Sequence, residues 1–241
     1  MNKKLVSILI LLGLWTVLAL SIHSDVILPT PLSVLTRLIE LMQTSKFYTN
    51  LFTTFLRAHL AFGMSLLIGI GLALICYRWK KVEEILSIWI KGLQTIPQIS
   101  FIILLYFWLS NEWCVYVVII LMAFPITYFN YLEHLNNLSH EYTDIIQLTN
   151  HSWWDLVFMV YLPLCHPSLM ATIKSGLPLS LKVCVMSEVL IYTSVGIGKQ
   201  ISLAKTGLDM VSVFSWTFAL ITLITIEMEI IRQIEEKLMK D

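Results

Sequence analysis

Residues 58–77 read AHLAFGMSLLIGIGLALICY and contain no Asp, Glu, Lys or Arg. A helix of about 20 apolar residues is long enough to cross the hydrocarbon core of a bilayer. The apolar residues form a continuous run rather than an alternating pattern, which favours a helix over a strand of a membrane barrel. We therefore expect a membrane-spanning helix here, and this expectation decides the fold class.

The same pattern recurs along the chain. Similar uncharged runs cover residues 5–24, 92–111, 113–132 and, somewhat shorter, 210–226. A further span is predicted within 168–194, although this stretch carries charged side chains and Pro178. The sequence thus predicts an all-α polytopic integral membrane protein with about six transmembrane helices in a lipid bilayer.

The composition agrees with a membrane protein. Hydrophobic residues make up 57% of the 241 residues and charged residues 13%, against about 45–50% and about 25% in soluble domains. The 16 basic and 16 acidic side chains cancel, and the sequence offers no basic patch suited to nucleic acid. The four cysteines stand singly in or beside apolar runs, so we interpret them as small buried hydrophobic residues.

Basic residues near the ends of the spans predict the orientation. Lys3, Arg78 and Lys237 fall on one side of a six-span chain with their basic neighbours, and fewer basic residues fall on the other side. The positive-inside rule then places both termini in the cytoplasm of a cell with this protein in its cytoplasmic membrane. We expect two parts: residues 1–49, an N-terminal span with an outer amphipathic segment, and residues 50–235, the transmembrane core.

Two segments are not expected to span the membrane. Residues 25–50 contain a Pro-Thr-Pro turn that opens an amphipathic helix over 34–42. Residues 133–166 hold four acidic residues and four of the six histidines but no Lys or Arg. A cytoplasmic loop without basic residues departs from the usual bias, so we expect a partner protein to hold it.

The loop at 133–166 has the pattern of helix, turn, helix. Asn150 suits a left-handed turn, Ser152 can cap a second helix, and this helix is expected to stop before Pro163. The H-E-x-x-D run at 140–144 differs from the zinc-protease motif in its last residue and lacks a convincing third ligand. We expect no catalytic group, no metal site and no cofactor in this chain.

The loop also resembles the cytoplasmic E-A-A-x-x-x-G loop of ABC importer permeases, followed by an apolar run at 157–162 and a proline. The matching positions are Asp144, Ile145, Ile146, Asn150 and Pro163. Four further motifs resemble the nitrate, sulfonate and taurine branch of these permeases and follow in its order. They are the L-P-x-P stretch at 28–31, the Arg-containing and Gly-containing helix at 56–71, the I-P element at 96–97, and Ser187-Glu188-Val189-Leu190 followed by Gly196-Ile197-Gly198.

The resemblance implies a type I ABC importer permease fold, in which two permease copies form one pathway. It also implies a cytoplasmic ABC ATPase, which supplies the driving force, and an extracytoplasmic substrate-binding protein. The expected cargo is a small polar or anionic nutrient such as a sulfonate, taurine, nitrate or a thiamine-precursor pyrimidine. The residues implied to couple the loop to the ATPase are Glu141, Asp144, Ile145, Ile146, Asn150 and Pro163.

The loop departs from the family pattern in identity while it keeps the spacing. Asp replaces the family Glu, two isoleucines replace the alanines, and Asn replaces the Gly. In the family, the acid can pair with a basic side chain of the ATPase. The bulkier isoleucines favour a dedicated ATPase over a shared one.

Ionisable residues within or beside spans are functional-site hypotheses. Arg57, Lys91, Lys182 and Glu188 are therefore candidates for lining the pathway, with snorkelling or pairing between helices as the alternative. The Gly-Lys pair at 198–199 fails the spacing of a phosphate loop, so ATP would be hydrolysed by another polypeptide.

Two other functions are considered for a membrane protein of this kind. A secondary transporter often carries two related halves, and the sequence shows no internal repeat. A membrane-embedded enzyme needs catalytic groups that converge at membrane depth, whereas the acids and histidines here gather in a loop.

Overall fold

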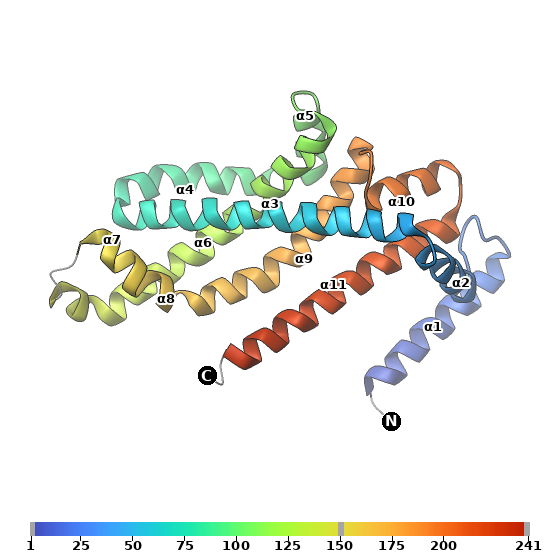
Figure 1. Ribbon diagram of the computed structural model, residues 1–241, viewed down its shortest axis with the longest axis horizontal. Coiled ribbons are helices and arrows are strands. Elements are labelled where there is room, and N and C mark those ends of the chain that lie inside the picture. Colours follow the sequence, from blue (N-terminus) through green and yellow to red (C-terminus); the bar gives the residue numbers. More distant parts are fainter. Residues whose placement is uncertain (1–2, 149–151, 239–241) are drawn as a thin grey trace. The chain divides into compact units, whose positions relative to one another are not determined.

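The computed structural model describes the backbone of residues 3–148 and 152–238 and the side chains of 6–138 and 152–237. Figure 1 shows the helices in chain order. Helices account for 88% of the described residues, which contain no strand. The predicted all-α fold class is confirmed.

Four described helices are long and apolar enough to cross a membrane. They are α3 (Ser45–Arg78), α6 (Asn111–Leu148, to residue 138), α9 (His166–Ile191) and α11 (Met210–Leu238). They contain nearly all of the stretches predicted at 58–77, 113–132, 168–194 and 210–226. Pro178 lies inside α9 without ending it.

The span predicted at 92–111 is not one continuous helix. α4 (Lys80–Thr95) and α5 (Gln98–Tyr106) pass the test for a span only as a pair, with a bend of 97° between them. Ile96 adopts extended backbone angles, φ −73° and ψ 127°, because the ring of Pro97 disfavours a helical conformation in the residue before it.

The number of six spans stays a prediction. The described residues give four candidate spans, or up to five if the bent pair counts as one. α1 (Lys3–Ile22) has a shorter apolar stretch, Val6–Ile22, and the count of six depends on this helix crossing as well.

The predicted amphipathic helix begins earlier than residue 34. α2 (Pro31–Met42) has Thr30 as its N-cap, and the Thr30 hydroxyl accepts a hydrogen bond from the Ser33 N–H. Pro31 occupies the first helical position, where its missing N–H has no partner to lose. The remaining elements are α7 (Trp153–Leu156), the π-helix η1 (Val157–Tyr161), α8 (Leu162–Leu164) and α10 (Ile197–Thr206).

The chain divides into two compact units. Unit 1 comprises residues 1–55 and 185–227, and unit 2 comprises residues 56–184 and 228–241. Helices α3, α9 and α11 each contribute residues to both units. The predicted division between residues 49 and 50 separates two continuous stretches, whereas each compact unit combines two separate stretches of the chain. The predicted division stays a prediction.

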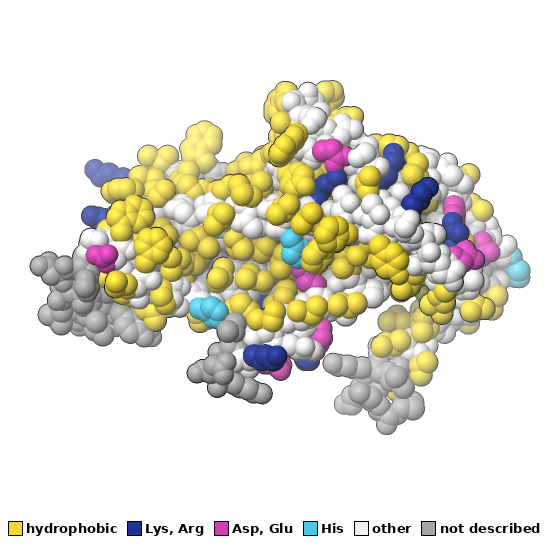
Figure 2. Space-filling model, in the orientation of Figure 1, with side chains coloured by type: hydrophobic (Ala, Val, Ile, Leu, Met, Phe, Trp, Pro, Cys, Tyr) yellow, Lys and Arg dark blue, Asp and Glu magenta, His cyan; other side chains and the backbone are white. Residues whose placement is uncertain are grey.

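Unit 1 has a small core around aromatic side chains. Phe47 stacks on Trp216 with ring centroids 5.2 Å apart, and Ile197 is buried in the same cluster. Trp15 brings α1 onto α11, where its ring stacks on Phe218 at 5.7 Å. Most other large side chains of α1 are exposed, and Figure 2 shows hydrophobic side chains on the surface of the helices. Such a surface is stable in contact with lipid.

Unit 2 has a larger core, and small residues let its helices approach closely. A Cβ atom at Gly69 would lie 2.6 Å from the Thr127 side chain, and one at Gly176 would lie 2.3 Å from the Phe62 ring. All four cysteines of the chain are buried and free of disulfides, which confirms their interpretation as small core residues. The main cluster of the unit contains Cys76, Ile90, Tyr128, Tyr131, Leu135, Val157 and Tyr161.

Candidate functional site

Glu188 lies in the last turns of α9, and its side chain is fully buried in unit 1. The Thr54 hydroxyl of α3 lies 3.0 and 2.9 Å from the two carboxylate oxygens, to which it can donate. The backbone N–H of Gly198 donates to Glu188 Oε2 at 2.9 Å. A buried carboxylate requires such donors, because it has lost its hydration.

The same polar groups hold the chain segment that follows α9. The Ile197 N–H donates to Thr54 Oγ1 at 2.8 Å, and the Gly196 N–H donates to Asn50 Oδ1 at 2.8 Å. The first N–H groups of α10 thus find side-chain acceptors on α3. We name these residues the Glu188 clamp: Asn50, Thr54, Glu188, Gly196, Ile197 and Gly198.

Two glycines make the clamp possible. Gly196 has φ 142°, a backbone conformation that side chains rarely allow, and a Cβ atom there would lie 2.4 Å from a carboxylate oxygen of Glu188. A Cβ atom at Gly198 would lie 2.5 Å from the Val185 carbonyl oxygen. The G-x-G element is therefore needed after Glu188 because its backbone approaches the carboxylate too closely for a side chain to fit.

We name residues 141–163 the coupling segment, after the role that the family resemblance implies. Glu141, Asp144, Ile145 and Ile146 lie on the helical backbone of α6, but their side chains lie outside the described residues, as does the whole of Asn150. The second half of the segment comprises α7, η1 and the start of α8.

The predicted cap of the second helix is confirmed. The Asp155 N–H donates to Ser152 Oγ at 3.3 Å, and Asp155 Oδ2 accepts from the Ser152 N–H at 3.2 Å. This reciprocal pair is a capping box that begins α7.

The predicted stop before Pro163 is wrong, because the helical run continues to Leu164. The π-helical turn η1 ends at Tyr161, and Pro163 lies in the first turn of the next short helix. The Leu162 N–H bonds to the Val157 carbonyl oxygen five residues back, so the π-helical turn shifts the hydrogen-bond register directly before the proline.

Aromatic contacts fasten the coupling segment to α3. The Trp153 ring lies 6.0 Å from that of Tyr77 and 5.6 Å from that of Tyr161, and the Arg78 guanidinium lies 5.5 Å from the Trp153 ring centroid. At the end of α8, His134 Nε2 is 3.1 Å from the Leu164 carbonyl oxygen. The residues that follow position 151 are therefore in contact with both α3 and α6.

Cys165 follows α8 and is fully buried in the main cluster of unit 2. Burial raises the pKa of its thiol to about 11, although a hydrogen bond with Tyr131 acts in the opposite direction. The thiol is therefore neutral at physiological pH and acts as a packing residue.

The four residues predicted to line a pathway lie in different surroundings. Arg57 is buried and forms an ion pair with Glu112 of α6. Lys91 is exposed, with its Nζ 5.9 Å from the Phe129 ring centroid, and Lys182 is exposed on α9. Glu188 belongs to the clamp. Their role in a pathway stays a prediction, and pairing between helices is the observed state of Arg57.

Sequence reasoning did not single out Asn50 and Thr54. These residues and Arg57 stand at positions i, i+4 and i+7 of α3, so they share one face of a helix that is otherwise rich in apolar residues. This polar stripe on an apolar helix was the signal in the sequence that could have identified Asn50 and Thr54. Its partners, Glu188 and Glu112, lie far away in the sequence and could not be inferred from spacing.

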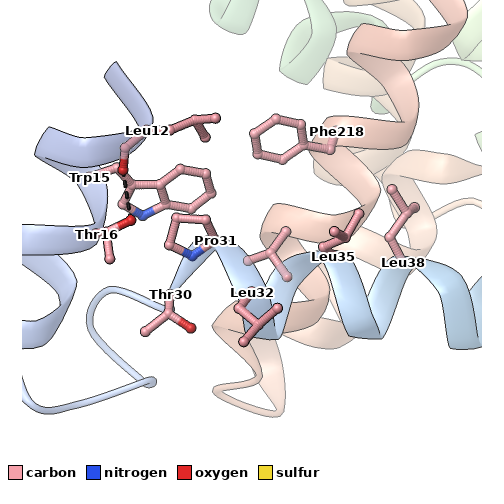
Figure 3. A pocket seen from close by; sticks show the side chains of 10 residues that line it. Leu12, Trp15, Thr16, Thr30, Pro31, Leu32, Leu35, Leu38 and Phe218 are labelled. Carbon is pink, nitrogen blue, oxygen red and sulfur yellow. Dashed lines mark hydrogen bonds between the residues drawn. The ribbon is translucent and has the colours of Figure 1, made fainter. Parts of the chain in front are cut away.

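A pocket of about 490 Å³ in unit 1 is unsuited to a polar substrate (Figure 3). Its lining is mostly hydrocarbon and includes Leu12, Trp15, Pro31 and Phe218. The Thr16 hydroxyl donates to the Leu12 carbonyl oxygen at 2.7 Å, so this lining hydroxyl is already engaged.

Comparisons with known proteins give the family. The profile of the binding-protein-dependent transport system inner membrane component family matches residues 65–240. The formylaminopyrimidine transport permease protein ThiX of Halalkalibacterium halodurans is 28% identical over 174 residues, which cover 71% of this chain and 69% of ThiX. A protein of Bacillus subtilis named as an aliphatic sulfonates transport permease, SsuC, is 23% identical over 233 residues, which cover 96% of this chain and 84% of SsuC.

These matches support the transport interpretation over a secondary transporter or an embedded enzyme, because the relatives are transport permeases. A binding-protein-dependent system implies a substrate-binding protein and an ATPase as partners. The apolar helices agree with a multi-pass membrane protein. The chain belongs to the binding-protein-dependent transport system inner membrane component family and is the permease subunit of an ABC importer.

Proposed function

We propose that this chain, as a pair of identical copies, forms the pathway through which a small polar or anionic nutrient enters the cell. The pathway opens to one side at a time, and ATP binding and hydrolysis in the partner ATPase drive the change. The names of the two relatives, which specify a formylaminopyrimidine and aliphatic sulfonates, support this substrate class.

Uptake by whole cells tests the substrate. The chain is expressed with its ATPase and binding protein in a host that lacks its own systems for both compounds, and uptake of labelled formylaminopyrimidine and of an alkanesulfonate is measured. Accumulation of one of them that stops when ATP hydrolysis is abolished is the expected result. Uptake of neither compound contradicts the proposed substrate class.

The coupling segment is proposed to dock on the ATPase through Glu141, Asp144, Ile145, Ile146 and Asn150, with Pro163 near its end. The observation that carries this proposal is the capped helix at Ser152, fastened by Trp153 to Tyr77 and Arg78 of α3. A segment held in this way can transmit a displacement to a membrane helix. The segment 133–166 also contains no Lys or Arg, which suits contact with basic groups on a partner.

Charge reversal tests the coupling role. Asp144→Lys is expected to place like charges together and to weaken docking by at least about 1–3 kcal/mol. Asn150→Gly should be tolerated and Asn150→Val should not, since glycine accepts a left-handed turn and valine does not. Copurification of the ATPase and substrate uptake are measured for each variant at equal expression. Full copurification and uptake for Asp144→Lys and Asn150→Val would show that the loop is only a connector.

Both termini are proposed to lie in the cytoplasm, as the basic residues indicate. Single cysteines are introduced at the exposed positions Lys46, Lys81 and Thr206, and the four buried native cysteines provide an unreactive background. A membrane-impermeant reagent should label positions 46 and 206 from outside and should not label position 81. External labelling at 81 would reverse the orientation.

A further inference from the structure

A groove of about 530 Å³ lies in unit 2 between the second half of α3 and the start of the coupling segment's second half. Gly71, Leu74 and Ile75 line it from α3, and Trp153 and Trp154 line it from α7. Its volume falls within the range of about 300–1,000 Å³ that is common for small-molecule sites. The lining is almost wholly apolar, so the groove suits a hydrocarbon chain.

The absence of a side chain at Gly71 contributes to the groove. A Cβ atom at this position would meet no heavy atom within 4 Å. The space beside Gly71 is therefore open, and a larger side chain there would occupy it without forcing the helix to move. This property provides a way to fill the groove selectively.

A positive charge lies at one end of the groove. Among the described residues that line it, Arg78 is the charged one, and its guanidinium stacks over Trp153. The guanidinium carries five N–H donors in a planar fork. Such donors match the oxygens of a phosphate.

The neighbouring charges leave this end positive. On α4, Lys80 pairs with Glu83 at 2.9 Å, and Lys81 and Glu84, one of each sign, are both exposed. On α7, Asp155 forms the capping box with Ser152 and does not line the groove. The two basic and two acidic residues of α4 offset each other in net charge, so the charge of Arg78 remains at the lining. Electrostatics therefore favour an anionic ligand over a neutral one.

Two exposed tryptophan side chains also line the groove. Trp79 is 56% exposed and Trp154 is 66% exposed, and both line the groove. Exposed tryptophans of membrane proteins concentrate at the level of the lipid head groups. Their position agrees with an acyl chain along α3 and a head group beside Arg78.

We propose that the groove binds one anionic phospholipid, with an acyl chain beside Gly71 and the phosphate at Arg78. Basic pockets next to membrane helices on the cytoplasmic side bind anionic head groups. The assignment of the lipid to the cytoplasmic leaflet rests on the orientation proposed above, whereas the location of the site in the protein does not. Because the groove joins α3 to Trp153 and Trp154, the bound lipid braces the coupling segment against α3.

Native mass spectrometry of the detergent-purified complex of the full chain with its ATPase tests the site. The complex is incubated with equal amounts of phosphatidylglycerol and phosphatidylcholine that carry the same acyl chains. We expect the complex to retain phosphatidylglycerol about fivefold over phosphatidylcholine, the ratio for one basic residue near a head group.

Two variants distinguish binding of the lipid's acyl chain from binding of its head group. Gly71→Leu should remove retention of both lipids, and Arg78→Gln should remove the preference for phosphatidylglycerol and keep basal retention. Gly63→Leu is the matched control for the first, because a Cβ at Gly63 also meets nothing within 4 Å and Gly63 does not line the groove. Lys81→Gln is the control for the second.

Equal retention of the two lipids by the wild type would overturn the proposal, as would unchanged retention in Gly71→Leu. Displacement of phosphatidylglycerol by excess inorganic phosphate would assign Arg78 to a free anion instead. Loss of ATPase copurification with lipid retained in Gly71→Leu would assign the groove to the ATPase. The lipid measurement uses no transport, so a failed coupling role leaves it unaffected.

Discussion

The Glu188 clamp and the coupling segment are two connections flanking the same helix, α9, and they are built in opposite ways. The clamp is buried, and its backbone N–H groups bond to side-chain acceptors. The second half of the coupling segment is a series of short helical turns with large exposed side chains, among them Trp154, Phe158 and Met159. The first arrangement fixes a loop in one position, and the second leaves large side chains exposed, which suits the docking role proposed above.

The difference predicts two kinds of mutational effect. A buried polar network admits little change, because each group that loses its partner stays away from water. An exposed segment that is held by a few aromatic contacts can lose them without unfolding the spans. Changes in the clamp should therefore reduce the stability of the protein, and changes in the coupling segment should reduce transport at normal stability.

The largest effect is expected at the clamp glycine with positive φ. Gly196→Ala combines backbone strain with overlap against the Glu188 carboxylate, for a loss of about 2–6 kcal/mol. Gly207→Ala is the control, since φ is −82° there and a Cβ would lie 3.5 Å from its nearest neighbour. Monodisperse yield and the thermal unfolding midpoint in detergent are measured. Equal values for the two variants would show that the clamp does not constrain the fold.

A smaller loss is expected from the hydroxyl that links the clamp. Thr54→Val keeps the shape of the side chain but removes the donor to Glu188 and the acceptor for the Ile197 N–H, for about 1–3 kcal/mol. Thr54→Ser keeps the hydroxyl and should remain close to the wild type. The same unfolding assay applies, and a Val variant as stable as the Ser variant would contradict the linking role.

Trp153→Leu tests the aromatic contacts that hold the coupling segment. The change removes the aromatic contacts with Tyr77 and Tyr161 and the cation–π contact with Arg78, together about 1–2 kcal/mol. We expect reduced uptake and ATPase copurification at a nearly normal unfolding midpoint. Trp154→Leu, at a more exposed neighbour, should change the free energy of unfolding by less than about 0.5 kcal/mol. A collapse of yield in Trp153→Leu would place this residue with the clamp instead.

The smallest effect concerns Asp209, which caps α11 outside the span. Burial acts against ionisation, but hydrogen bonds from the Ser212 hydroxyl and N–H and the charge of Arg37 lower the pKa of Asp209 below its ordinary value. A lowered folded-state pKa stabilises the protein above the ordinary value near 3.8, and the stabilisation disappears as the pH falls through the folded-state pKa.

The carboxyl of Asp209 is exposed, so solvent screening keeps its contribution small. Asp209→Ala should cost about 0.5–1 kcal/mol through loss of the cap, and Asp209→Asn should cost less because Asn also caps helices. Unfolding midpoints are compared at pH 7 and below pH 4. The difference between wild type and Asp209→Asn should shrink at the lower pH, and a difference that grows would contradict the sign.

Most of the local structure could be predicted from the residues alone. The uncharged run at 58–77 indicated a span because hydrocarbon length and helix rise set the number of residues needed. Ser152 marked a helix start because a cap lies next to the helix that it begins, whereas the Pro-Thr-Pro run at 29–31 indicated a helix but not its first residue. The bend at Pro97 was signalled by Ile96-Pro97 but was outweighed by hydropathy, so one span was predicted where two helices lie.

The partners of the buried charges were decided by tertiary structure. Glu188 was identified as an ionisable residue within a span, yet its contact with Thr54 joins positions 134 residues apart. Arg57 was likewise identified without Glu112. Capping and span length depend on neighbours along the chain, whereas the partner of a buried charge depends on which helices pack together. That packing is set by many weak apolar contacts and close glycine approaches, and spacing in the sequence does not encode it.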